Sequence, residues 1–122
     1  MAALKQPEAS STLAEMRRAV AAIEEKKGES IRVLDVRGKS SITDYVIIAS
    51  GTSNPHLKAI KSALTDVLKE AGVTLSAEDR DLESGWIVVD AFDFIVHLQT
   101  QDMRDFYRLD QLWKDATCVA IE

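Results

Sequence analysis

The amino-acid sequence predicts an α/β fold of mixed α and β elements, in which a single mixed β-sheet of about five strands is flanked by helices. One apolar run, from Asp44 to Ser50, leads directly into a pattern with helical spacing, which is typical of a buried strand followed by a helix. Two later apolar runs are joined only by Phe92 and Asp93, so these strands must form an antiparallel hairpin. A chain of 122 residues is expected to bury one core.

The chain divides into an expected flexible tail over residues 1–11 and a single domain over residues 12–122. The tail has no sustained periodicity and contains Pro7. Thr12 and Glu15 fit a capping box, which predicts a helix over 12–27. Apolar side chains then recur at helical spacing, and we expect Gly28 to end this helix in the left-handed conformation.

The middle of the chain contains the predicted strand–loop–helix step. A short β-type run over 31–36 precedes the strand that begins at Asp44. The loop 51–53 breaks that strand, and Ser53 or Asn54 can cap a helix over 55–71.

The C-terminal part is predicted to complete the sheet. A short strand is expected to start at 73–75, and the hairpin strands cover 86–91 and 94–98. Thr100 can cap a helix over 101–107, and a last apolar turn follows at 109–113.

Composition excludes several classes of protein. No apolar run approaches the ~20 residues that a membrane helix needs, and the one cysteine, Cys118, cannot form an intrachain disulfide. Twenty acidic and 15 basic residues give a formal net charge of −5, which disfavours a free-standing nucleic-acid binder. We therefore expect a cytoplasmic protein with no membrane association and no direct sequence-specific nucleic-acid binding.

The charge is unevenly distributed along the chain. Residues 1–75 have a net charge of +2, and residues 76–122 have a net charge of −7. An acidic surface of this kind could attract a basic partner, because complementary potentials steer encounter. The alternative is that the acidic residues only maintain solubility.

Neither a metal centre nor a catalytic constellation is evident. The candidate ligands His56, His97 and Cys118 are isolated, so we expect no metal and no cofactor. His97 lies within a strand, which favours a hydrogen-bonded structural histidine, and Cys118 resembles a small packing residue. The loop 51–53 before a helix could bind an anion. A nucleotidyltransferase would also need paired carboxylates, which are missing near this loop.

The acidic C-terminal half also contains most of the aromatic residues. Aromatic residues among carboxylates suit a basic protein partner better than a small molecule. The candidate partner-binding residues are Trp86, Asp90, Phe92, Asp93, Arg104, Tyr107 and Asp110.

Several motifs in order resemble the ribosomal silencing factor (Iojap-like) family over residues 12–118. The matching segments are Asp-Val-Arg-Gly-Lys-Ser-Ser-Ile-Thr-Asp-Tyr at 35–45, Gly-Thr-Ser at 51–53 with His56, Ala59 and Ile60, Trp86 to Asp90, Val96-His97, and Arg104-Asp-Phe-Tyr-x-Leu-x-x-Leu-Trp113. Pro55 departs from the family pattern, which usually has a basic residue there.

This resemblance implies a fold similar to a nucleotidyltransferase domain without its catalytic acids, and therefore no enzymatic activity. It also implies binding to the large ribosomal subunit through a basic ribosomal protein, L-fourteen. Such binding would block association with the small subunit and repress translation under nutrient limitation.

Two other interpretations remain open. One is a nucleotide-binding or nucleotidyltransferase-type enzyme that uses Asp44 and the loop 51–53. The other is a homodimeric module, and a homodimer could also form when a silencing factor is free.

Overall fold

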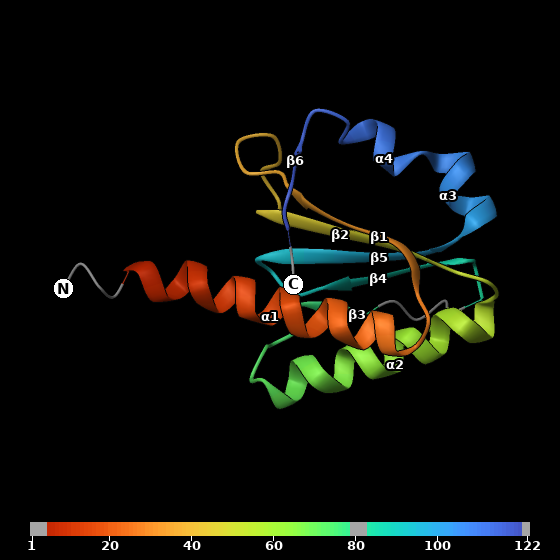
Figure 1. Ribbon diagram of the computed structural model, residues 1–122, viewed down its shortest axis with the longest axis horizontal. Coiled ribbons are helices and arrows are strands. Elements are labelled where there is room, and N and C mark those ends of the chain that lie inside the picture. The colour runs from red at the N-terminus through yellow and green to blue at the C-terminus, as the bar shows by residue number, and fades with distance from the viewer. Residues whose placement is uncertain (1–4, 79–82, 121–122) are drawn as a thin grey trace.

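A six-stranded mixed sheet forms the centre of the protein, with helices on both faces (Figure 1). The computed structural model describes residues 5–78 and 83–120. The strand order is β3-β4-β5-β2-β1-β6. The elements are α1 (Lys5–Glu25), β1 (Glu29–Asp35), β2 (Tyr45–Gly51), α2 (Asn54–Glu70), β3 (Ala77–Glu78), β4 (Trp86–Asp90), β5 (Phe94–Thr100), α3 (Gln101–Tyr107), α4 (Leu109–Leu112) and β6 (Thr117–Cys118).

The sheet is mixed because one of its pairings is parallel. Strands β2 and β5 run parallel, and the pairs β1–β2, β1–β6, β3–β4 and β4–β5 are antiparallel. The outermost strands, β3 and β6, have two residues each, and β6 is the one strand beyond the five expected. The predicted fold class is confirmed.

Each face of the sheet has its own apolar core. The larger core lies under α1 and α2, where Met16 and Leu64 pack with Phe94 and other buried side chains. The opposite face carries α3 and α4 (Figure 1). There the apolar side chains of β1 and β2 meet Leu109 and Trp113. Strand β2 is buried along its whole length, which confirms the interpretation of its continuous apolar run.

Helix α1 begins at Lys5, so the predicted start at Thr12 was wrong. Pro7 lies in the first turn, where its missing amide hydrogen is not needed, and it therefore does not prevent a helix. Thr12 is buried within the helix. The expected flexible tail over 1–11 is thus replaced by helix from Lys5, and residues 1–4 lie outside the described part of the chain.

The residue that ends α1 in the left-handed conformation is Lys27, with φ 67°, instead of Gly28. Gly28 is needed for a different reason. Its amide donates to the Ile23 carbonyl at 2.8 Å, and a Cβ at this position would collide with the Ile23 side chain. The expected glycine is therefore required by close packing and not by its backbone angle.

The strand predicted to start at 73–75 was wrong, because β3 lies at Ala77–Glu78. The predicted hairpin and the caps of α2 and α3 are confirmed. Strands β4 and β5 form the antiparallel hairpin, and the Asp90 carboxylate accepts the Phe92 amide at 2.9 Å in the connecting turn. The Ser53 hydroxyl accepts the His56 amide at the start of α2. Thr100 caps α3 in the same way by accepting the Met103 amide. Among the described residues, no helix has the length and apolar character to cross a membrane.

Substitutions at the end of α1 should change stability in opposite directions. Gly28→Ala should lower the free energy of unfolding by about 1–3 kcal/mol, because the new methyl group overpacks against Ile23. Lys27→Gly should raise it by about 0.5–1 kcal/mol, because glycine adopts a positive φ without strain. Urea unfolding measures both changes. Equal losses in the two variants would contradict this account of the helix end.

Candidate partner-binding face

The face of the sheet that carries α3 and α4 is only partly covered. Helix α4 lies over β1 and β2, where its side chains complete the smaller core. The alternation of β4 and β5 directs every second residue to this side, and these side chains remain partly exposed except for the buried Gln99. We call this surface the open face and define it by Trp86, Val88, Asp90, Ile95 and His97.

The end of the open face next to α3 is aromatic. The Trp86 and Tyr107 ring centroids are 4.8 Å apart, and Phe106 meets Tyr107 edge-on at 4.9 Å. Phe106 is 76% exposed and Tyr107 is 50% exposed. Aromatic rings that remain this exposed are available to a partner, and aromatic side chains are enriched among the residues that dominate binding energy.

His97 lies in the floor of the open face beside Trp86. The Trp86 Nε1–H group donates to His97 Nδ1 at 3.1 Å, which bears out the expected hydrogen-bonded histidine. Burial of the ring lowers the pKa of His97 to about 4. The imidazole is therefore neutral near pH 7.

The opposite end of the open face is acidic. Asp90 lies about 13 Å along β4 from Trp86, at the usual rise per residue. The turn that follows exposes Asp93 and the Phe92 side chain, which is 60% exposed. Burial raises the pKa of Glu15, and the negative charge of Asp93 raises it further. Five of the seven predicted residues thus lie on or next to this face: Trp86, Asp90, Phe92, Asp93 and Tyr107.

Arg104 and Asp110, which were also predicted to bind a partner, do not lie on the open face. Arg104 is 7% exposed, and its guanidinium donates to both Asp110 carboxylate oxygens at 3.0 and 3.1 Å. The same group donates to Ser50 Oγ at 2.8 Å and to the Ser30 carbonyl at 2.7 Å. The hydrogen bonds of Arg104 therefore lie within the protein, where they connect α3 and α4 to β1 and β2.

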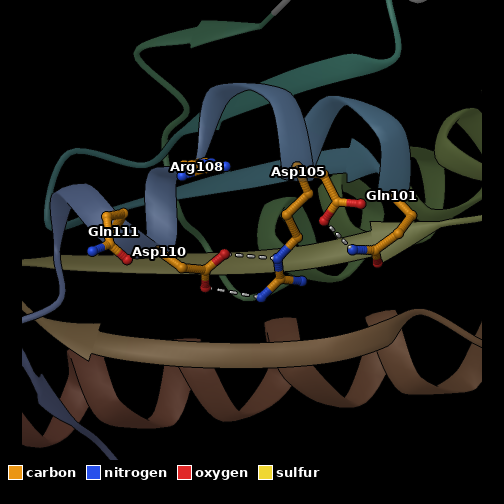
Figure 2. A pocket seen from close by; sticks show the side chains of 6 residues that line it. Gln101, Asp105, Arg108, Asp110 and Gln111 are labelled. Atoms are coloured by element: carbon orange, nitrogen blue, oxygen red, sulfur yellow. Dashed lines mark hydrogen bonds and ion pairs between the residues drawn. The ribbon is translucent and has the colours of Figure 1, made fainter.

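A second arginine completes this ionic network. Arg32 Nη1 donates to Asp110 Oδ1 at 2.9 Å. Hydrogen bonds from Arg104 and then Arg32 hold the pKa of Asp110 below its ordinary value, against the opposing effect of burial. Figure 2 shows Asp110 and its ion pair at the edge of a cavity of about 390 Å³ between α3 and α4. Its lining is polar: Gln101, Arg104, Asp105, Arg108, Asp110 and Gln111.

The residues of the alternative nucleotide site are not brought together. Asp44 precedes β2, whereas the segment 51–53 begins at the last residue of β2, so they lie at opposite ends of a seven-residue strand, about 20 Å apart. The loop's polar groups have other partners, because the Thr52 amide donates to His56 Nδ1 and Ser53 caps α2. A Cβ on Gly51 would overlap the Leu57 side chain, so this glycine permits close packing of α2.

The sequence interpretation missed several residues of the open face. Val88 and Ile95 form part of its floor, and Phe106 extends its aromatic end. The alternation of β4 and β5 could have located the two aliphatic residues.

Cys118 was expected to pack as an apolar residue, but it is exposed, and its Sγ accepts a hydrogen bond from Arg32 Nη2 at 3.4 Å. Within the described ranges, no three His, Cys, Asp or Glu side chains form a group able to hold a metal ion.

Removing the buried guanidinium should destabilise the protein. Arg104→Ala leaves the Ser50 hydroxyl without its donor and leaves the Asp110 carboxylate with Arg32 alone, so the free energy of unfolding should fall by about 2–4 kcal/mol. Arg37→Ala is the control, because Arg37 pairs with Asp35 at an exposed site and should contribute little. Urea unfolding compares the variants. A small effect of Arg104→Ala would show that this network is not structural.

Stability should also decline in mild acid because of His97. The unfolded chain binds a proton near pH 6.5, whereas the folded ring resists protonation until about pH 4. The free energy of unfolding should therefore fall by up to about 1.4 kcal/mol per pH unit as the pH is lowered through this interval. His97→Gln should flatten the dependence. An unchanged slope in that variant would assign the acid sensitivity to other groups.

Comparisons with known proteins place this architecture in a family. Residues 8–122 match a family model described as ribosomal silencing factor during starvation. The chain is 44% identical over 87 residues to the ribosomal silencing factor RsfS of Haemophilus influenzae, covering 71% of this chain and 85% of that protein. It is 34% identical over 104 residues to its counterpart in Halalkalibacterium halodurans, covering 85% and 89% of the two chains.

A solved structure shows the same fold. A crystal structure of a Chromobacterium violaceum protein superposes with a TM-score of 0.78 and 35% sequence identity, covering 83% of this chain and 84% of that one. The family model spans nearly the whole chain, and the relatives cover more than two thirds of it. The chain therefore belongs to the ribosomal silencing factor family.

Proposed function

We propose that this protein binds the large ribosomal subunit through its open face and sterically blocks association with the small subunit. The observation that carries this proposal is an exposed apolar and aromatic surface with acidic residues at one end, in a member of the silencing factor family. The direct partner is a basic ribosomal protein, L-fourteen. The result is repression of translation under nutrient limitation, and the site of action is the cytoplasm.

The charge distribution supports a basic protein surface as the target. Asp90 lies at one end of the open face, Asp93 lies exposed in the turn that follows, and residues 76–122 have a net charge of −7. RNA phosphates would be repelled by these carboxylates, whereas Lys and Arg side chains would be attracted. The carboxylates should act on the rate and the register of docking more than on the final affinity.

The aromatic end supports a tight contact. Trp86 and Tyr107 are already held in a fixed arrangement, so ordering them on binding costs little conformational entropy. Burial of such rings in the centre of an interface contributes a large part of the binding energy. The mode of action is therefore steric, and the protein is not an enzyme.

A homodimer of the free protein would use the same kind of contact. An exposed aromatic surface can bury itself against a second copy when the partner is absent. Sedimentation at several protein concentrations tests this, and competition between dimerisation and subunit binding would locate both contacts on one face.

Charge reversal at the acidic end tests the proposed function. Asp90→Lys combined with Asp93→Lys should weaken binding to purified large subunits at least about tenfold, because attraction to a basic surface becomes repulsion. Asp66→Lys is the matched control, since Asp66 is exposed on α2, on the other side of the sheet. Co-sedimentation with large subunits measures binding, and subunit-joining assays measure the block.

Two results would oppose the proposal. Binding unchanged in the double variant would place the contact elsewhere, and unchanged subunit joining at excess protein would remove the steric role. Calorimetry with ATP or CTP and magnesium addresses the enzymatic alternative, since micromolar binding would favour it.

A further inference from the structure

Trp86 and His97 lie in the floor of the open face, and the hydrogen bond between them determines which ring nitrogen of His97 carries the proton. The indole nitrogen of Trp86 can only donate, and it points at His97 Nδ1 from 3.1 Å. His97 Nδ1 must therefore be the acceptor, so the proton of the neutral ring lies on Nε2. Trp86 thus fixes the tautomer of His97 and leaves an N–H group on the second ring nitrogen.

The second histidine, His56, has a hydrogen-bond partner at each of its two ring nitrogens. His56 Nδ1 accepts the Thr52 amide at 2.9 Å, and Nε2 contacts the Lys26 carbonyl at 2.7 Å. Both nitrogens of His56 are occupied, which identifies it as a structural residue that connects α2 to the end of α1. His97 Nε2, by contrast, has no hydrogen-bond partner within residues 5–78 and 83–120.

The surroundings of His97 make this donor consequential. Its strand neighbours in register are Ile48 of β2 and Val88 of β4, so the groups flanking it in the sheet are apolar. A partner that covers the floor with apolar groups alone would bury an N–H without an acceptor, which is costly. Burial keeps the ring neutral near pH 7, so the group remains a single, uncharged donor.

We propose that His97 is a specificity-determining residue of the open face, whose Nε2–H donates to an uncharged oxygen of the docked basic protein segment. The acceptor is a main-chain carbonyl or a hydroxyl oxygen. A carboxylate is disfavoured because Asp90 lies two residues along β4 from Val88, the residue opposite His97. This inference rests on the proposed function, since it names the chemistry by which the same face recognises its partner.

Two substitutions at position 97 separate the two ring nitrogens. The amide of His97→Asn can replace Nδ1 as acceptor for Trp86, but it does not extend to the position of Nε2. The amide nitrogen of His97→Gln reaches that position and restores an outward N–H donor. His56→Gln is the control, because it perturbs a histidine that lies away from the open face.

The experiment measures binding of full-length protein to purified large subunits by co-sedimentation. His97→Asn should bind about five- to twentyfold more weakly than the wild type, the loss expected for one donor withdrawn from a buried acceptor. His97→Gln should bind within about threefold of the wild type, and His56→Gln should also retain binding. Thermal unfolding and the indole N–H resonance of Trp86 verify that each variant is folded with the tryptophan in place.

Nitrogen NMR of the free protein provides a second test that needs no ribosome. It should find the His97 proton on Nε2 near pH 7, and a proton on Nδ1 would overturn the inference. If the wild type and His97→Asn bind large subunits equally well, the inference about His97 is also overturned, while the proposed function remains intact. If the wild type itself fails to bind large subunits, the proposed function and this inference are both refuted.

Discussion

The guanidinium of Arg104 is the contact on which the arrangement of the candidate site depends. It reaches Ser30 and Ser50, which lie 74 and 54 residues away in sequence, and it pairs with Asp110 after the turn between α3 and α4. One buried side chain therefore attaches both short helices to β1 and β2. Helices of seven and four residues could not persist there on their own propensity, so tertiary contacts must hold them.

The asymmetry of the sheet follows from this attachment. Because α4 is drawn over β1 and β2, the β4–β5 half of the same face remains uncovered. The end of α3 is also placed so that the Tyr107 ring contacts the Trp86 ring at a tilt of 49°. The ion pair between Arg104 and Asp110 thus positions α3, whose last residue forms the aromatic end of the open face. The acidic turn after β4 forms the opposite end of this face.

Local patterns in the sequence were sufficient for most of the fold. The continuous apolar run of β2, the two-residue link before Phe94 and the Ser53 cap each express a short-range rule, and each prediction was confirmed. The inward direction of Arg104 and Asp110 could not be predicted in this way, because their contacts depend on segments far away in sequence. For the candidate site, residue type indicated an acidic and aromatic surface, but only the long-range contacts of Arg104 separated the open face from the internal network.

The central claim is that the open face is where the large subunit docks. A photo-reactive benzophenone side chain placed at Ile95 on that face, and separately at Ala59 on the exposed surface of α2, tests it directly with bound large subunits. If the large subunit docks on the open face, position 95 should cross-link to a basic ribosomal protein and position 59 should give no comparable product. A cross-link from position 59 alone would contradict it and would assign docking to the helical side of the sheet.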